Sequence, residues 1–282
     1  MLSESQKELL RFPFQRLPLR ASVGSELGSE WVDPELDVIW KPSDNKILGV
    51  LPKDQFIIPH VDAHDRVEAA IRKMSIDDVF VSKHQVLRNG ARVFTHYRLP
   101  TFKMDIDNPQ YDGGDDKTVD TLIPEVILRN GYDDVINFGL EWGLYRVICE
   151  NGARVMVMGH HGTPKSLMGD IDVDVIVNGV EQFLESLTKD FFGRIQEMVL
   201  NTAAELPVQT QAWLSHHLTD RLLSTYDFKV KEAQERLQQN ISEWTLFNII
   251  TNVITHEVNS YSRRRSLEQV AARKFRFGIT LR

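Results

Sequence analysis

A short stretch around residue 90 carries side chains suited to nucleic-acid contact. Two strand-like runs, 79–87 and 91–99, flank Asn89-Gly90, and this dipeptide predicts a β-hairpin because both turn residues must adopt positive φ. A two-residue turn places cations and rings on one face: Lys83, Gln85, Arg92, Phe94, His96 and Arg98. Cations neutralise phosphates, and stacking on an aromatic ring stabilises binding by about 1–3 kcal/mol per base. The sequence therefore predicts that this face binds single-stranded DNA.

The same register leaves a second interpretation of the hairpin open. The turn pairs Val86 with Val93, His84 with Thr95, Ser82 with Tyr97 and Phe80 with Leu99. This opposite face is mainly apolar, so we expect it to face the core. Val79, Val81 and Leu87 also lie on the basic face, and cations are common on exposed strands. A solvated strand face with no ligand explains the pattern as well.

The C-terminal tail, residues 261–282, repeats the combination of cations and aromatic rings. Its candidate nucleic-acid-binding residues are Arg263, Arg264, Arg265, Arg273, Lys274 and Arg276. Two other interpretations remain open for the tail. One is a helix C-terminus, where cations suit the helix dipole, and the other is a strand that returns to the sheet.

A segment of opposite charge runs from Asp105 to Asp120, with six aspartates and one lysine. Asn108-Pro109 and Gly113-Gly114 interrupt it, which predicts an exposed loop. This loop, through Asp112, Asp115 and Asp116, or the basic tail, supports an alternative function. In that alternative the protein is not an enzyme but binds a host or phage protein of replication or transcription.

A third hypothesis is a metal-dependent phosphoesterase or nuclease. His60, Asp62, His64 and Asp65 offer two imidazoles and two carboxylates, which suit a divalent metal. His60 and His64 lie on one helical face only if the helix begins before His60. We expect instead that Asp62 is the N-cap of a helix over 62–74, and this start argues against the metal site.

Sequence motifs give little support to catalysis. The patterns GxSxG, GxxxxGK[ST] and GxGxxG are absent, and Cys149 lies in an apolar run where an inert thiol is usual. We therefore expect a binding protein with no catalytic residues, metal or cofactor.

Composition indicates an ordinary globular protein in a reducing compartment. Lys and Arg number 33 against 40 Asp and Glu, so the net charge of −7 excludes a simple polycation that coats DNA but leaves a local basic surface open. A single cysteine permits no intrachain disulfide. With no apolar run of about 18 residues and no signal-peptide pattern, we expect a cytoplasmic protein without membrane partners. A homo-oligomer is compatible with these features.

The order of elements predicts an α+β fold, with an antiparallel sheet and its hairpin in the N-terminal half and helices in the C-terminal half. Further strands are expected at 119–128 and 154–158, and helices at 138–150, 180–200, 210–224, 229–240 and 243–258. We expect a mixed sheet region over 1–178, a helical region over 179–260 packed on it and a basic tail over 261–282. These regions are expected to form one cooperative domain.

Several stretches together resemble a family of phage- and plasmid-encoded proteins catalogued only as a domain of unknown function. They are ILGVLPKDQFIIPHVDAHD, VLRNGARVF, VILRNGYDDVINFGLEWGLYRVICENGARV with the following GHHG, and WTLFNIITNVITHEV. Arg146, Cys149, Asn151 and Gly152 occupy the closing positions of the family's most specific motif, whereas Tyr132 stands where other members often have His. The resemblance implies a protein of mobile elements and, by analogy of fold, a likeness to single-strand annealing proteins of phage recombination.

Overall fold

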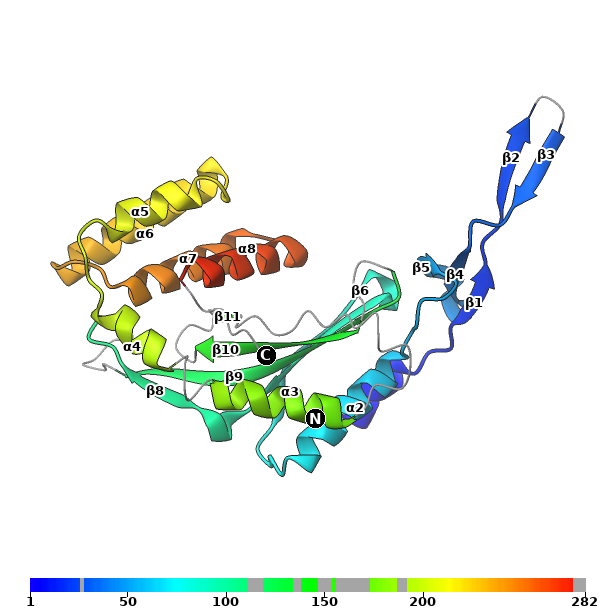
Figure 1. The fold of residues 1–282 in the computed structure, drawn as a ribbon, viewed down its shortest axis with the longest axis horizontal. Coiled ribbons are helices and arrows are strands. Elements are labelled where there is room, and N and C mark those ends of the chain that lie inside the picture. Colours follow the sequence, from blue (N-terminus) through cyan, green and yellow to red (C-terminus); the bar gives the residue numbers. More distant parts are fainter. Residues whose placement is uncertain are drawn as a thin grey trace. The chain divides into compact units, whose positions relative to one another are not determined.

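The computed structural model describes residues 1–25, 28–110, 119–133, 138–146, 154–155, 173–186 and 192–275. Antiparallel sheets occupy the N-terminal half and helices the C-terminal half (Figure 1), which confirms the predicted α+β fold. Among the described helices, none has the length and apolar character needed to cross a bilayer.

The chain forms two compact units. Unit 1 comprises residues 1–98, 126–141 and 161–179, and unit 2 comprises 99–125, 142–160 and 180–282. The chain therefore passes between the units several times, and the units do not follow a single cut near residue 178.

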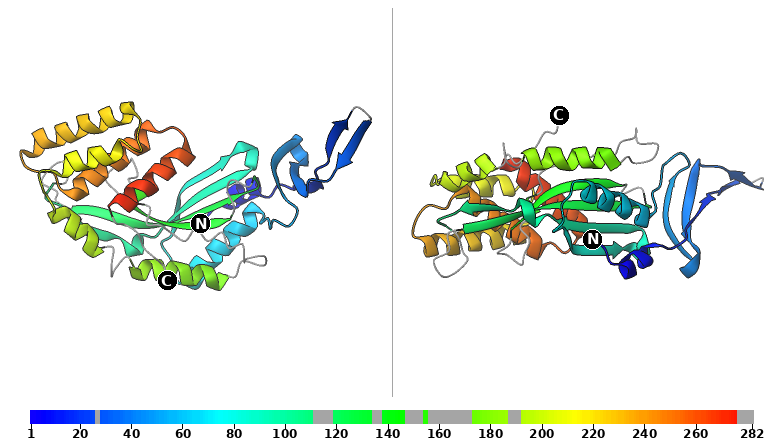
Figure 2. Two further views of the ribbon diagram at one scale, coloured as in Figure 1. Left: turned by 45° about the horizontal axis from the view of Figure 1, so that its top comes forward. Right: turned by 90° about the horizontal axis from the view of Figure 1, so that it is seen from below.

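Unit 1 begins with a small helix and two small sheets. Helix α1 (Glu4–Leu10) is followed by β1 (Gln15–Pro18), β2 (Ala21–Ser25), β3 (Gly28–Val32), β4 (Leu36–Lys41) and β5 (Lys46–Pro52). Strands β2 and β3 form a hairpin of their own, and the other three form an antiparallel sheet in the order β1-β4-β5 (Figure 2). Helix α2 (His60–Lys73) follows and contacts α1.

Helix α2 begins two residues earlier than the sequence predicted. Its N-cap is Pro59, not Asp62, and His60 is its first residue. Proline is tolerated where a helix begins because its missing N–H would have no partner in the first turn.

A larger sheet has the strand order β11-β10-β9-β7-β6, and β8 also pairs with β9. Its strands are β6 (Phe80–Leu87), β7 (Arg92–Arg98), β8 (Met104–Asp107), β9 (Val119–Gly131), β10 (Gly139–Arg146) and β11 (Arg154–Val155). The strands predicted around 79–87, 91–99, 119–128 and 154–158 are present, although residues 156–158 lie outside the described part of the chain.

The hairpin prediction is confirmed at the turn and corrected further out. Asn89 and Gly90 have φ of 58° and 99°, and the N–H of Ala91 donates to the carbonyl of Arg88 at 3.1 Å. Val86 pairs with Val93 and His84 with Thr95 as predicted. A register shift between Val81 and Lys83 then moves Phe80 opposite Arg98 and Val81 opposite Tyr97, so the pairs Phe80–Leu99 and Ser82–Tyr97 are wrong.

The helix predicted over 138–150 is wrong where the structure describes it, because residues 139–146 form β10. Leu140 and Leu144 stand four apart, which imitates helical spacing. Gly139 and Gly143 disfavour a helix, and strand pairing on both sides favours the extended backbone. Residues 147–150, with Cys149, lie outside the described chain.

The ends of the predicted acidic loop belong to strands. Asp105 in β8 pairs with Thr121 in β9, and the Thr121 hydroxyl donates to the Asp105 carboxylate at 2.6 Å. The Asp120 carboxylate is buried and accepts a hydrogen bond from Nε1 of Trp244 at 3.0 Å. The middle of the segment, which includes Asp112, Asp115 and Asp116, lies outside the described residues.

Six helices follow the sheet in the described part of the chain. They are α3 (Val173–Ser186), α4 (Phe192–Leu200), α5 (Leu206–Leu214), α6 (Asp220–Leu237), α7 (Glu243–Glu257) and α8 (Tyr261–Lys274). In unit 2 the largely buried α7 contacts α4, α6 and α8, and its Trp244 and Phe247 rings stack at 5.7 Å between centres. Helix α6 runs through residues 225–228, where the sequence predicted a gap between two helices.

Candidate nucleic-acid interface

The basic face predicted for the hairpin is largely buried. Arg92 is 6%, Phe94 1% and His96 0% exposed. The physical reason is that both faces of β7 are covered, because Val93, Thr95 and Tyr97 on the opposite face are also 0% exposed. A buried ring is inaccessible to a base, so the expectation that these three side chains form an exposed stacking surface is wrong.

Arg92 has a structural partner. Its Nε donates to Oδ2 of Asp133 at 2.5 Å, and both side chains are at least nine-tenths buried. Lys83 and Arg98 keep part of their surface exposed, and the Arg98 guanidinium lies 5.9 Å from the centre of the Phe80 ring.

His60 lies in a buried hydrogen-bond network rather than at a metal-binding surface. Nδ2 of Asn130 donates to the Ile58 carbonyl at 2.8 Å and to Nδ1 of His60 at 2.9 Å, while Nε2 of His60 lies 2.7 Å from the Gly90 carbonyl. A carbonyl only accepts, so the neutral ring carries its proton on Nε2. Burial lowers the pKa of His60 to about 4.

His64 belongs to a second internal chain of polar groups. Its Nδ1 lies 2.6 Å from the Tyr97 hydroxyl and its Nε2 3.3 Å from the Thr95 hydroxyl, which in turn lies 2.8 Å from Nδ1 of His84. Burial lowers the pKa of His64 to about 3 and raises the pKa of Tyr97 well above its usual value.

The proposed metal ligands do not converge. His60 and His64 point into unit 1, whereas Asp62 and Asp65 are exposed, and Asp65 pairs with Nζ of Lys7 at 2.6 Å. Within the part of the chain that the structure describes, no group of three or more His, Cys, Asp or Glu side chains is arranged to hold a metal ion.

The first part of the basic tail is helix α8, not a strand. Arg263, Arg273 and Lys274 are exposed. Arg264 has a structural contact, because its Nε and Nη2 donate to the Val258 carbonyl at 3.1 and 2.8 Å. The side chain of Arg265 and the whole of Arg276 lie outside the described structure.

A tryptophan, a histidine and a lysine lie close together on unit 2, and the sequence did not predict this cluster. Trp213 in α5 is half-buried, and Nζ of Lys274 in α8 lies 5.9 Å from its ring centre. The exposed His217 ring lies 4.7 Å from the same indole. The four-residue spacing of Trp213 and His217 was a usable signal, whereas the approach of Lys274 depends on tertiary packing. We call Trp213, His217 and Lys274 the Trp213 cluster.

The exposed cations of α8 share a face. Arg263 and Lys274 are eleven residues apart, which is about three helical turns and roughly 16 Å along the axis. The two side chains therefore project from the same side of the helix, and a bound polyanion that follows α8 is able to contact both.

Comparisons of the chain with protein-family models, with curated proteins and with solved structures find no match. The resemblance to phage- and plasmid-encoded proteins therefore stays a prediction, and the functional argument depends on the residues.

Proposed function

We propose that the protein binds single-stranded DNA through unit 2, along the face of α8 that carries Arg263 and Lys274. The observation that supports this proposal best is the Trp213 cluster, in which an ammonium group lies beside a partly exposed indole. Binding of single strands without sequence preference needs rings for stacking and cations for phosphates, and the cluster offers both.

The charge distribution favours a confined site. The chain carries a net charge of −7, so long-range attraction of DNA by the whole molecule is not expected. Arg273 and Lys274 concentrate positive charge in the last turn of α8. Each phosphate neutralised there releases condensed counterions, which makes affinity depend on salt.

The cellular role belongs to the same proposal. The resemblance to proteins of phages and plasmids favours a role in replication, recombination or transcription of such DNA in the cytoplasm. No enzymatic step is part of the proposal.

Fluorescence anisotropy with a labelled oligothymidylate at two salt concentrations tests this function. Trp213→Leu removes the ring and should weaken binding about tenfold. Lys274→Gln should weaken binding and flatten the salt dependence. Lys231→Gln is the matched control, because Lys231 is an exposed cation on α6. The proposal is wrong if the wild type binds no strand, if salt has no effect, or if all three variants bind alike.

A second candidate function, docking of a replication or transcription protein, is favoured by one face of the β1-β4-β5 sheet. Leu17, Val38 and Val50 align across the three strands, and Trp40 pairs with Ile47. Leu17, Ile47 and Val50 are 41%, 65% and 40% exposed. Exposed apolar patches of this kind mark protein contacts.

Sedimentation of the purified protein separates self-association from binding of another protein at this face. If Ile47→Lys converts an oligomer to a monomer, the face joins copies of this chain. If the wild type is already a monomer, a pull-down of replication proteins that Ile47→Lys abolishes is expected. Unchanged sedimentation and unchanged capture would exclude a docking role.

A further inference from the structure

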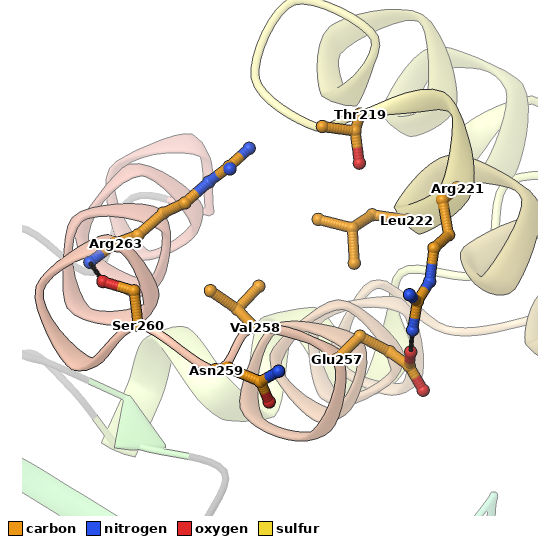
Figure 3. A pocket seen from close by; sticks show the side chains of 8 residues that line it. All are labelled: Thr219, Arg221, Leu222, Glu257, Val258, Asn259, Ser260 and Arg263. Carbon is orange, nitrogen blue, oxygen red and sulfur yellow. Dashed lines mark hydrogen bonds and ion pairs between the residues drawn. The ribbon is translucent and has the colours of Figure 1, made fainter.

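Unit 2 contains a pocket with a volume of about 230 Å³ that lies apart from the residues of the Trp213 cluster (Figure 3). It is lined by Thr219, Arg221, Leu222, Glu257, Val258, Asn259, Ser260 and Arg263. The lining comes from the start of α6, the end of α7 and the start of α8. Six of the eight lining residues are polar or charged, and Leu222 and Val258 add an apolar part to the wall, so the pocket offers hydrogen-bonding groups on a partly apolar surface.

Two arginines from different helices give the pocket an excess of positive charge. Nη2 of Arg221 donates to Oε2 of Glu257 at 2.7 Å, which holds the guanidinium at the pocket wall. The Arg263 guanidinium is exposed and forms no ion pair with any residue that the structure describes. Glu257 neutralises one of the two cations, and the other remains available for an anion.

The geometry of the lining favours an anion further. In Figure 3 the Thr219 hydroxyl points into the pocket, and the Arg263 guanidinium reaches toward Thr219 from α8. Arg264 donates twice to the Val258 carbonyl, so this carbonyl at the end of α7 already has cationic donors. Asp220 is exposed at the first turn of α6 and is not part of the lining.

The N-termini of two helices also favour an anion in this pocket. Both α6 and α8 begin at the pocket, and helix N-termini attract anions through their free N–H groups and their dipole. Thr219 has the extended backbone of an N-cap, with φ of −75° and ψ of 158°, yet its side chain makes no capping hydrogen bond within the described structure. The Thr219 hydroxyl and the first N–H groups of α6 are thus placed to bind a ligand.

We propose that this pocket holds one backbone phosphate of a single DNA strand bound along α8. The inference rests on the proposed function and adds a defined phosphate site to it. Arg263 links the pocket to the face of α8 that also carries Lys274, so one strand reaches both. A guanidinium suits this role because its fork of N–H donors binds two phosphate oxygens at once.

Oligothymidylate and inorganic phosphate are the two probes that test the inference. Arg263→Gln should weaken oligothymidylate binding about tenfold, since a hydrogen bond to a charged group is lost. The slope of log affinity against log salt should become shallower by about 0.7, the value for one phosphate on a single strand. Arg236→Gln is the control, because it removes the same charge from the far part of α6.

Thr219→Val distinguishes a specific phosphate site from non-specific electrostatic attraction of DNA, because it removes a hydroxyl and no charge. We expect about fivefold weaker strand binding and unchanged salt dependence, since the variant loses one hydrogen bond from an uncharged donor and no charge. Its thermal unfolding should match the wild type, because the Thr219 side chain makes no capping bond in the described structure. If Arg263→Gln unfolds, Arg221→Gln replaces it in the same assay.

The outcomes distinguish this inference from the proposed function. Normal strand binding by Arg263→Gln and Thr219→Val, together with weak binding by Trp213→Leu, overturns the phosphate site and leaves the proposed function standing. Absence of strand binding by the wild type overturns both. Protection of amides 219–222 from hydrogen exchange by inorganic phosphate but not by oligothymidylate assigns the pocket to free phosphate and also overturns the inference.

Discussion

The Arg92–Asp133 ion pair illustrates how a single side chain changes its role with burial. Arg92 has the residue type of a phosphate ligand, but its side chain is 7% exposed and that of Asp133 is 8% exposed. Loss of one partner of a buried pair leaves the other charge without compensation, which costs about 3–5 kcal/mol. The arginine therefore contributes to folding rather than to a surface site.

Arg92→Met should accordingly lower the free energy of unfolding by about 3 kcal/mol in a urea titration. Arg88→Met is the matched control, because the Arg88 side chain is 66% exposed and lies 3.8 Å from the same carboxylate. The control should cost less than about 1 kcal/mol. Native-like stability of Arg92→Met combined with lost DNA affinity would contradict the structural role.

The buried histidines predict a loss of stability in mild acid. Burial lowers the pKa of His60 to about 4 and of His64 to about 3, whereas the unfolded chain titrates near 6.5. Between these values the unfolded state binds more protons, so stability is complete above about pH 6.5 and falls as the pH decreases. Each histidine should account for about 2 kcal/mol between about pH 7 and about pH 5.

Urea titrations at several pH values check this prediction. His64→Gln should reduce the slope of the free energy of unfolding against pH by the equivalent of about one proton, because the glutamine does not titrate. His216→Gln is the control, since His216 is exposed on unit 2. A stability independent of pH between 7 and 5, or equal slopes for both variants, would show that the buried imidazoles are not responsible.

Residue types alone predicted part of the candidate site. The exposed cations Arg263, Arg273 and Lys274 follow from the composition of the tail. Phe94 was misassigned because strand alternation separates two faces but does not reveal that both are covered. The contact between Trp213 and Lys274 joins residues far apart in the chain, and no local pattern encodes such a contact.

At the scale of elements, local signals were the most informative. The hairpin follows from Asn89-Gly90, whose backbone angles are a property of the turn itself. The bulge beside Ser82 and the strand at 139–146 depend on pairing with neighbouring strands, which local residue patterns do not encode. Helix α7 was predicted within one residue from its helical spacing, and the structure adds that Ser242 caps it, with its hydroxyl accepting from the Thr245 N–H at 3.1 Å.

Strand β5 provides a test of packing between elements. A Cβ atom on Gly49 would lie 1.9 Å from the Tyr132 carbonyl oxygen, which is backbone and has little freedom to move. Gly49→Ala should therefore separate β5 from the segment around Tyr132 and cost about 1–3 kcal/mol. Differential scanning fluorimetry should record a lower melting temperature, by roughly 2–4 °C per kcal/mol.

Gly193→Ala serves as the control for that substitution. No atom of the described residues lies within 4 Å of a Cβ atom on Gly193, which is in α4. This variant should be neutral or slightly stabilising, because alanine favours a helix. Equal effects of the two variants would contradict the close approach of β5 to Tyr132.

At the scale of the whole molecule, the two units share strands of the chain. Strand β9 contributes residues 119–125 to unit 2 and 126–131 to unit 1, and β10 changes unit after residue 141. The helices of unit 2 also depend on early residues. Gln110 accepts from the Ser242 N–H at 2.7 Å and donates to the Asn240 carbonyl at 2.7 Å.

This sharing predicts that residues 179–282 do not fold when produced alone. The fragment lacks Asp120, whose buried carboxylate accepts from Trp244, and Gln110, which binds the segment before α7. We expect its circular dichroism to show little cooperative unfolding, whereas the full chain unfolds in one transition. In the full chain Trp244→Phe should cost about 1–3 kcal/mol, since it removes the indole donor to a buried carboxylate. A fragment that melts cooperatively would show instead that the helices form an independent domain, and binding could then be tested on that fragment.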